Sequence, residues 1–409
     1  MARVAVIGAG FVGLSAAYWL VRDGHQVTLY DPAGAAGGAS FGNAGTFANY
    51  ACIPVNNPTV FRDLPHYLLS GDSPLRLRWG YLPQLMPWLL GFLRSSTTAR
   101  YTRSATALAT LLGRAQQGYD EMLTLSSLHG FVRPRECLYL YSSVSTFEAS
   151  LPTLELRRSL GVKTRILDQE AVQALEPSLQ PLFARGALFE GSWHLSDPSA
   201  FLQALQSWLV EQGMQVRAAA VQGLQPQAHG VVLQTAEGSA RHDYVAVCAG
   251  AHSKALAAQC GDHVPLEAER GYHLMFAGAS HLVSRPVGWA ERGFYMTPMA
   301  EGLRVAGTVE LAGMGLQKHQ GLLDLLRFSS QRALPQLGQP VAPWLGFRPT
   351  LPDGLPVLGR SSASSRVVYA FGHQHIGLTL GGLSGMVVAD QVAGRASGLD
   401  LNPFAATRF

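Results

Sequence analysis

The stretch Val4-Ala5-Val6-Ile7-Gly8-Ala9-Gly10-Phe11-Val12-Gly13 starts as a run of apolar residues and continues as Gly-x-Gly-x-x-Gly. The run predicts a buried strand, and the glycines predict a tight turn into an amphipathic helix. Gly8 permits the turn, Gly10 lets backbone approach a pyrophosphate, and Gly13 lets the helix pack closely on the sheet. Unpaired amides at the start of that helix favour phosphate charge. The stretch therefore predicts a dinucleotide-binding unit.

A second strand, residues 27–30, ends at Asp31. A carboxylate at this place accepts hydrogen bonds from ribose hydroxyls and repels a 2′-phosphate, which favours a dinucleotide without that phosphate. Gly-x-Gly-x-x-Gly also arises by chance. Here it follows a strand, opens a helix and has an acid at the expected distance, so we prefer the functional interpretation.

Length and composition limit the class of protein. The chain has 409 residues, 47% hydrophobic and 14% charged, with a net charge of +4. This length predicts two domains, and the small charge predicts no nucleic-acid surface. The cysteines form no C-x-x-C pair, so we expect no metal site and a reducing, cytoplasmic location. They are Cys52, Cys137, Cys248 and Cys260.

Segment 81–93 is apolar and rich in aromatic residues. Arginines flank it on both sides: Arg76, Arg78, Arg94 and Arg100. Such a segment can dip into a membrane interface, which would place the protein at the inner face of the cytoplasmic membrane. A buried or lid-forming helix is the alternative, and the sequence leaves both open. No apolar run reaches the roughly 18–20 residues that span a bilayer, and glycines break the N-terminal run too early for a signal peptide.

The remaining pattern defines the organisation of the chain. Small residues fill the loop Gly37–Gly45, where backbone must approach something flat. A helical block at 51–150 interrupts the nucleotide-binding pattern, which returns with the strand at 244–247. Short alternating strands between 262 and 349 predict an antiparallel sheet.

These segments predict an α/β fold in which a Rossmann-like domain is interleaved with an α+β domain built on an antiparallel sheet. We assign residues 1–50, 151–260 and 350–409 to the nucleotide-binding domain. We assign residues 51–150 and 261–349 to the substrate-binding domain.

Further motifs follow in order: the Gly37–Gly45 loop, Ala249-Gly250-Ala251, Glu269-Arg270-Gly271-Tyr272, Ala306-Gly307-Thr308-Val309-Glu310, the Gly346–Pro356 segment with its Arg348-Pro349-Thr350-Leu351-Pro352-Asp353-Gly354, and Gly372-His373-Gln374-His375-Ile376-Gly377-Leu378-Thr379. Together with the first glycine motif they resemble the FAD-dependent D-amino-acid oxidase superfamily. The closest similarity is to its D-amino-acid dehydrogenase (small subunit) branch. The motifs keep their order from residue 4 to about 390, which is more specific than any one of them.

The resemblance implies an FAD domain of the glutathione-reductase type, with the isoalloxazine between the two domains. The start of the last helix would aim backbone amides at the pyrimidine end of the ring, where hydride arrival leaves negative charge. The implied FAD contacts are Gly8, Gly10, Gly13, Asp31, Ser40, Asn43, Ala44, Gly45, Val221, Ala249, Gly250, Gly372, His373, Gly377, Leu378 and Thr379.

Substrate contacts are implied by the same resemblance. Arg348 resembles the arginine that pairs with the substrate carboxylate, and a guanidinium can hold both oxygens; the alternative is a structural arginine between domains. Tyr272 is a second candidate for the carboxylate, or a half-buried sheet residue. His375 stands where the glycine-oxidase branch has an arginine, and it either contacts the substrate, titrates near neutral pH, or packs over the ring. Tyr50 and His273 are further pocket candidates.

The implied reaction is oxidative deamination of a D-amino acid or a secondary (imino) acid, with hydride transfer from the α-carbon to flavin N5. It needs no dedicated protein base if the amine enters unprotonated, so the site residues act mainly by positioning. A quinone would accept the electrons if 81–93 meets a membrane, and oxygen otherwise. Three alternatives stay open: a glycine- or sarcosine-type amine oxidase, the flavin subunit of a heteromeric amine dehydrogenase, and a non-catalytic flavin-binding protein.

Overall fold

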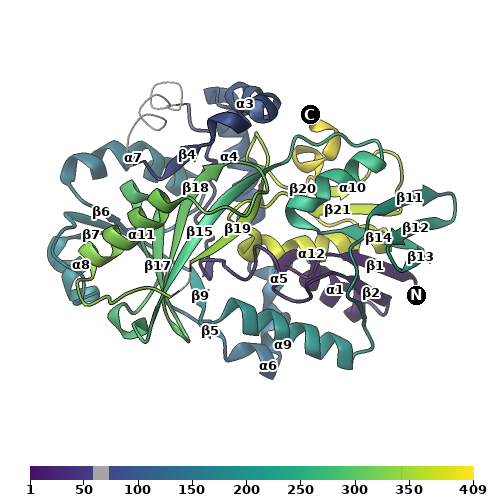
Figure 1. Ribbon diagram of the computed structural model, residues 1–409, viewed down its shortest axis with the longest axis horizontal. Helices are drawn as coiled ribbons and strands as arrows, with labels where there is room; N and C mark the ends of the chain where they lie inside the picture. Colours follow the sequence, from purple (N-terminus) through teal and green to yellow (C-terminus); the bar gives the residue numbers. More distant parts are fainter. Residues whose placement is uncertain (59–72, 342) are drawn as a thin grey trace.

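The structure is a computed structural model that describes residues 1–58, 73–341 and 343–409. Two regions lie side by side (Figure 1). One holds both chain termini and a mostly parallel sheet, and the other is built on a larger, mostly antiparallel sheet. The predicted α/β fold with two interleaved sheet regions is confirmed.

The parallel sheet has six strands in the order β10-β2-β1-β14-β21-β20. The first five run parallel, and β20 pairs antiparallel with β21. Their bounds are β1 (Arg3–Ile7), β2 (Gln26–Tyr30), β10 (Gln215–Arg217), β14 (Tyr244–Val247), β20 (Val357–Arg360) and β21 (Val367–Phe371).

Different layers cover the two faces of this sheet. Alternate residues of β1, such as Val4 and Val6, pack against α1 (Phe11–Arg22), α9 (Pro198–Glu211) and α12 (Gly377–Ala393). The intervening residues pack against the opposite layer. That layer consists of the meander β11 (Gly223–Gln227), β12 (Gly230–Thr235) and β13 (Gly238–His242), together with α10 (Ser253–Gln259). Both faces are buried, which explains the continuous apolar runs of the parallel strands.

The first and last long helices, α1 and α12, lie against each other through glycines (Figure 1). A Cβ added at Gly385 would lie 2.6 Å from the backbone oxygen of Ser15, and one at Gly381 would lie 3.2 Å from that of Phe11. Side chains at these places would push the helices apart. Segments from the two ends of the chain thus build one layer.

The larger sheet runs β19-β15-β18-β17-β16-β6-β8-β7, with β4 paired to β18. Pairs β16/β6 and β18/β4 are parallel, and the other pairs are antiparallel. Helix α11 (Gln320–Ala333) packs on one face. The strands are β4 (Leu75–Leu77), β6 (Cys137–Tyr141), β7 (Thr164–Asp168), β8 (Arg185–Phe189), β15 (Glu267–Ala277), β16 (Val287–Trp289), β17 (Phe294–Met299), β18 (Gly302–Leu311) and β19 (Trp344–Thr350).

Smaller elements join the two regions. A three-stranded sheet contains β3 (Thr46–Phe47), β9 (Trp193–Leu195) and β5 (Val132–Arg133). The other helices are α3 (Leu82–Ser95), α4 (Thr98–Leu112), α5 (Gln117–Asp120), α6 (Ser126–His129), α7 (Val144–Ser159) and α8 (Gln169–Leu175). Short 3-10 turns occupy Trp79–Tyr81, Met122–Thr124, Gly250–His252, Ser280–Leu282, Ala290–Arg292, Asn402–Phe404 and Ala406–Arg408.

Two segments pack differently from the domain assignment made on the sequence. Strands β7 and β8 fall within 151–260, yet they pair with β6 in the larger sheet. Leu108 and Leu111 of α4 fall within 51–150, yet they belong to the core around α1 and α12. Both segments bury apolar residues against a sheet or helix of the other region, which periodicity alone does not reveal. The division of the chain otherwise stays a prediction.

Within the described ranges, no helix has the length and apolar character needed to cross a bilayer.

Candidate active site

A cavity of about 1130 Å³ extends from the glycine motif of the parallel-sheet region to the larger sheet. Its walls come from the turn after β1, the 37–44 loop, the start of α12, strands β15, β18 and β19, and one face of α3. Most of the predicted site residues line it: Gly8, Gly10, Asp31, Ser40, Asn43, Ala44, Tyr50, Val221, Ala249, Gly250, Tyr272, Arg348, Gly372, His373, His375, Gly377 and Leu378.

The glycine motif forms a cradle that leaves no room for side chains. Gly8 has φ +108°, and a Cβ there would lie 2.4 Å from the backbone oxygen of Cys248. At Gly10 a Cβ would lie 2.8 Å from the Ser40 Oγ. Helix α1 has Gly10 as its N-cap. The Phe11 N–H donates to the Ser40 Oγ at 3.2 Å, which leaves the amides of Val12 and Gly13 for a phosphate. This geometry fits the pyrophosphate of a dinucleotide.

Asp31 is held at the end of β2 by backbone amides. Its Oδ2 accepts from the Ala9 N–H at 2.8 Å, and its Oδ1 accepts from the Ala33 N–H at 2.8 Å. Each carboxylate oxygen keeps acceptor capacity for a ribose hydroxyl. The side chain therefore both fixes the turn of the glycine motif and fits the predicted ribose contact.

The 37–45 loop is tied to the larger sheet. The buried Arg304 of β18 donates to the backbone oxygens of Phe41 and Asn43 at 3.0 and 2.8 Å. Asn43 Oδ1 accepts from the Gly45 N–H at 2.6 Å, and Gly45 has φ +73°. Charge-assisted hydrogen bonds from the larger sheet thus position a loop of the parallel-sheet region. A flat ring bound between the two regions would need such a fixed loop.

Residues around the start of α12 are also ordered by hydrogen bonds. His373 lies buried, and its Nε2 and the Ser384 Oγ are 2.8 Å apart; burial lowers the pKa of His373 to about 3. The Thr379 Oγ1 accepts from the Ala48 N–H at 2.9 Å. The N-cap, Ile376, provides no side-chain cap, so the first amides of α12 stay open. His373 is thus a neutral anchor for the helix.

Arg348 lies half-buried on β19 and holds a bulge of β18. Its Nη1 donates to the Thr308 oxygen at 2.8 Å and its Nη2 to the Gly307 oxygen at 3.3 Å. Thr308 has φ +58°, an uncommon value for a residue with a branched Cβ. Part of the guanidinium's donor set stays available to a ligand. The structure therefore fits both predicted roles, substrate anchor and structural link.

Glu269 pairs with Arg348 across β15 and β19. The carboxyl is buried and lines the cavity. Burial raises the pKa of Glu269, while the Arg348 charge and a hydrogen bond from Thr350 lower it. Burial likewise lowers the pKa of Arg348, while Glu269 raises it. The sequence analysis quoted Glu269 inside a motif but gave it no role; only the strand register shows that it faces Arg348.

Tyr272 points away from this pair. Neighbouring side chains of a strand face opposite sides, and the Tyr272 ring belongs to the core beneath α11. Its hydroxyl donates to Glu310 and accepts from the His319 N–H at 3.1 Å. These partners occupy the hydroxyl, so the sheet-residue interpretation fits better than a carboxylate contact.

Tyr50 is buried at the cavity wall and stacks on Phe189, with ring centroids 4.2 Å apart. Its hydroxyl has no hydrogen-bond partner among the described residues. Tyr295, which the sequence analysis missed, also lines the cavity, and its hydroxyl bonds to that of Tyr139. Tyr50 therefore remains a candidate donor to a ligand.

His375 projects into the cavity and is exposed to it, although it lies deep in the protein. Burial, and secondarily the Arg348 charge, lower the pKa of His375 to about 4. This lowered pKa favours a neutral imidazole at neutral pH and argues against the interpretation that His375 titrates there, which stays a prediction. His273 does not line the cavity; it stacks on Trp344 with centroids 5.0 Å apart.

Helix α3 covers the Arg348 end of the cavity. Trp88, Leu89 and Phe92 line it, and the Trp88 Nε1 donates to the Thr350 oxygen at 3.2 Å. Leu90, on the other face of the helix, is 47% exposed. The inner face of α3 thus covers the cavity, as one of the two alternatives for segment 81–93 predicted, while Leu90 on the outer face is exposed.

Three predicted FAD contacts do not line the cavity: Gly13, Gly45 and Thr379. Each of them supports a residue that lines the cavity. A Cβ at Gly13 would lie 1.8 Å from the Gly8 oxygen, so Gly13 serves the close packing of α1 on β1. In the described part of the chain, no group of three or more His, Cys, Asp or Glu residues could hold a metal ion.

Comparisons with known proteins agree with this geometry. Residues 3–391 match the family model described as FAD dependent oxidoreductase. The chain is 35% identical over 417 residues to a D-amino-acid oxidase of Bradyrhizobium diazoefficiens, covering 100% of this chain and 99% of that protein. It is 28% identical to a D-amino acid dehydrogenase of Paramagnetospirillum magneticum, with the same coverage. A glycine oxidase from Geobacillus kaustophilus shares the fold, with a TM-score of 0.76 and 21% identity over 100% of both chains.

Proposed function

Because the chain belongs to the family of FAD dependent oxidoreductases, we propose that it oxidatively deaminates a D-amino acid or a secondary (imino) acid. The cofactor is FAD, and the glycine cradle, Asp31 and the open amides of α1 and α12 fit it. When bound, FAD accepts the hydride from the substrate α-carbon at N5. The protein residues bind and orient the substrate and exclude water.

The observation that carries this proposal is Arg348 at the end of the cavity where the larger sheet meets the start of α12. Two backbone oxygens of the β18 bulge fix its guanidinium, so the remaining donors have a defined direction. A carboxylate there would form a charge-assisted pair in a half-buried place. The names of the two curated relatives support an amino acid as the donor of that carboxylate.

The groups around Arg348 suit a substrate that enters with a neutral amine. His375 is neutral at neutral pH and can accept a hydrogen bond from an amine N–H. The Tyr50 hydroxyl lies beside Cys137 and Tyr295 but has no hydrogen bond of normal geometry to a described residue, so it can donate to or accept from a ligand. Neither group is needed as a base once the amine has lost its proton. Their proposed role is to hold the α-carbon in line for hydride transfer.

The first experiment is anaerobic mixing of the FAD-loaded protein with D-amino acids, L-amino acids, N-methyl amino acids and hydroxyprolines. We expect D-amino acids or secondary amino acids to bleach the flavin absorbance. Bleaching by glycine or sarcosine alone would support the amine-oxidase alternative. No bleaching by any of them would indicate a subunit that needs a partner, or a flavin protein without turnover.

We also propose a peripheral membrane contact through the outer face of α3, with a quinone as electron acceptor. Trp79, Met86 and Leu90 are 62%, 38% and 47% exposed on and beside this helix. Arg94 at the end of α3 can meet anionic headgroups. Without such a contact, oxygen is the acceptor.

Liposome flotation with anionic vesicles tests this contact. We expect the Trp79→Asp, Leu90→Asp double variant to float less than the wild type. Val210→Asp is the matched control, because Val210 is 48% exposed on α9, at the opposite edge of the molecule (Figure 1). Equal flotation of all three proteins would argue against a membrane contact.

A further inference from the structure

The proposed function gives no role to the buried acid Glu269. This residue is only 7% exposed, yet it lines the main cavity. A carboxylate can accept about four hydrogen bonds. Within the described ranges, Thr350 is the one side chain placed to donate a hydrogen bond to it. A buried carboxylate with so few donors is costly unless a ligand supplies more of them.

Arg348 lies beside this acid but directs its hydrogen bonds elsewhere. The two residues are register partners on β15 and β19, so their side chains share one face of the sheet. The guanidinium extends over Gly271, where an added Cβ would lie 2.5 Å from its Cζ. Its two Nη atoms donate to the backbone oxygens of Gly307 and Thr308. The cavity wall therefore presents a carboxylate and a guanidinium next to each other, and neither is saturated.

This pair of opposite charges matches an amino acid. The carboxylate and the ammonium of a zwitterion are bonded to the same carbon, so they need a cationic and an anionic partner side by side. Among the described residues that line the cavity, the acids are Asp31 and Glu269, and Asp31 belongs to the glycine motif. Glu269 is thus the negative charge available to an ammonium whose carboxylate is on Arg348.

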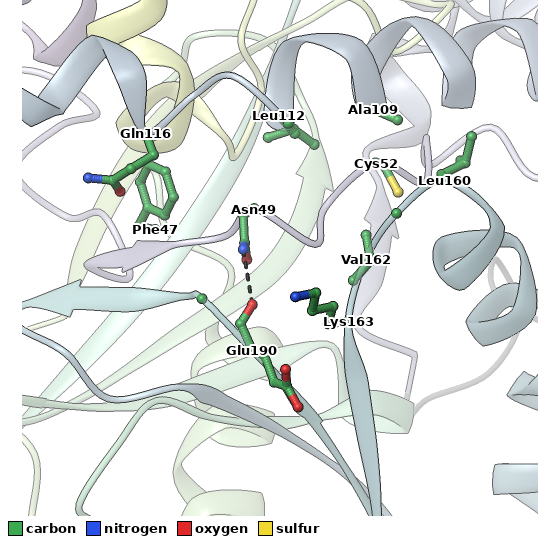
Figure 2. Close-up of a pocket in the computed structure, with 13 residues that line it drawn as sticks. Phe47, Asn49, Cys52, Ala109, Leu112, Gln116, Leu160, Val162, Lys163 and Glu190 are labelled. Atoms are coloured by element: carbon green, nitrogen blue, oxygen red, sulfur yellow. Dashed lines mark hydrogen bonds between the residues drawn. The ribbon is translucent and has the colours of Figure 1, made fainter.

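Shielding from water distinguishes this pair from other opposite charges on the molecule. Lys163 and Glu190, both drawn in Figure 2, lie at the rim of a second, smaller pocket of about 410 Å³ beside α4. Both residues are exposed, so water and salt screen their charges. Glu269 is buried, and a charge that reaches it interacts in a medium of lower dielectric constant.

We propose that Glu269 binds the α-ammonium of the substrate and takes a proton from it before hydride transfer. One N–H bond breaks, an O–H bond forms on the Glu269 carboxyl, and the nitrogen keeps the electron pair that the imine needs. The carboxyl returns its proton to water when the product leaves. The inference rests on the proposed function and deepens it: the zwitterion can enter, and the neutral amine is also produced inside the cavity.

The surroundings of Glu269 suit both steps. Burial raises the pKa of Glu269, which makes it a better proton acceptor, and Arg348 lowers it, which favours the ionised form before the substrate arrives. Two other titratable groups lie nearby, Glu267 on the same strand, which accepts from the Tyr81 hydroxyl, and His375 before α12. The residues of α3 and β18 that line the cavity do not titrate.

Two unreactive ligands test the ammonium contact without turnover. 2-Aminoisobutyrate carries an ammonium but no α-hydrogen, so the flavin cannot oxidise it, and isobutyrate lacks the amine. Titrations of the FAD-loaded protein, followed by the flavin absorbance spectrum, give both dissociation constants. We expect Glu269→Gln to weaken the binding of 2-aminoisobutyrate at least fivefold and to tighten the binding of isobutyrate. Glu269→Asp, which keeps the charge, should retain part of the affinity for 2-aminoisobutyrate.

Glu267→Gln is the matched control. Glu267 is a buried acid of the same strand, it bonds to Tyr81, and it does not line the cavity. This variant should leave both dissociation constants unchanged, because the new amide oxygen still accepts from the Tyr81 hydroxyl. A purely structural role of Glu269 would change the affinity for both ligands in the same direction. Such a parallel change, or no change for either ligand, in a folded Glu269→Gln protein would overturn the proposal.

Anaerobic reduction of the flavin by an amino acid tests the proton transfer. At pH 7 nearly all of the amino acid is zwitterionic, so Glu269→Gln should slow flavin reduction at least tenfold at low substrate concentration. The deficit should shrink as pH approaches the pKa of the substrate amine, because the neutral amine then enters directly. A deficit that is the same at every pH, or no deficit, would overturn the proton transfer. If no amino acid bleaches the flavin, the proposed function fails, whereas opposite effects on the two ligands would still establish the zwitterion site.

Discussion

Glu269 and Arg348 face each other on adjacent strands β15 and β19, and each shifts the pKa of the other toward its charged form. The guanidinium that we propose as substrate anchor thus already has a buried acidic neighbour. A substrate carboxylate would be a second negative group beside the same cation. Repulsion between the two carboxylates should therefore be part of the substrate affinity.

Removal of the arginine tests its role as anchor. Arg348→Ala should raise the KM for an amino acid by roughly 10- to 100-fold, because a charge-assisted pair is worth about 1.5–3 kcal/mol. The FAD content should stay near that of the wild type. Arg348→Lys should restore only part of the affinity, since an ammonium lacks the planar fork. An unchanged KM in a folded Arg348→Ala protein would assign the residue to the β18 bulge alone.

Glu269→Gln should tighten the binding of a carboxylate inhibitor that lacks an amine. The variant removes the competing negative charge, and we expect about a tenfold lower inhibition constant, equivalent to about 1.4 kcal/mol. In the wild type, the same inhibitor should bind better as pH falls and Glu269 takes up a proton. This pH dependence should be absent from the variant. Identical inhibition profiles would show that Glu269 does not interact with the bound carboxylate.

Substitutions at two glycines of the first motif should have different effects, one on FAD binding and the other on stability. In Gly10→Ala the new methyl group meets only the movable Ser40 Oγ, but it occupies the phosphate cradle. We expect FAD affinity to fall tenfold or more while the apoprotein keeps its thermal stability. In Gly13→Ala the methyl group meets the Gly8 backbone oxygen, so the apoprotein itself should lose stability. Equilibrium dialysis of FAD and thermal melts of both apoproteins distinguish these outcomes.

Substitutions of two neighbouring leucines of α3 should also have different effects on the KM. Leu89 lines the cavity, whereas Leu90 faces outward. Leu89→Asp places a carboxylate near the proposed substrate site and should raise the KM for D-amino acids with large apolar side chains about tenfold. Leu90→Asp should leave this KM unchanged. If both variants keep the wild-type KM, helix α3 does not contact the substrate.

The lowered pKa values of three buried histidines predict that the folded protein loses stability in acid. Burial lowers the pKa of His194 to about 4 and those of His273 and His373 to about 3, from an ordinary value of 6.5. Below pH 6.5 the unfolded chain binds protons that the folded protein does not, so the free energy of unfolding falls as pH falls. Each histidine should contribute up to about 1.4 kcal/mol per pH unit until the folded-state pKa is reached.

Thermal melts at several pH values between 7 and 4 measure this slope. His194→Gln should make the slope shallower, whereas His229→Gln, on an exposed turn, should leave it unchanged. A wild-type melting temperature that does not change over this range would contradict the prediction.

The cofactor half of the site was more predictable from the sequence than the substrate half. Gly8, Gly10 and Asp31 act through local backbone geometry, which a short motif encodes. Glu269, Thr308 and Tyr295 depend on which strands pair and in which register, and no local pattern specifies that. The segment 81–93 shows the same limit: its apolar character was evident, but only tertiary packing separates Leu89 from Leu90.

Tyr272 and His375 show a second limit. A motif gives the residue type at a position but not the direction of its side chain or its electrostatic surroundings. Tyr272 faces the core beneath α11, and burial beside Arg348 keeps His375 neutral. Both facts follow from contacts made by residues far away along the chain.

The packing of α1 against α12 has a consequence for biosynthesis. The glycine motif is translated long before the helix that completes its layer and carries the amides proposed to meet the flavin ring. Until then the apolar face of α1 lacks its native cover, and the nascent chain must be kept from aggregating. Tight capture of FAD should accordingly wait until α12 has been synthesised, and premature termination before α12 should yield a product that binds no flavin.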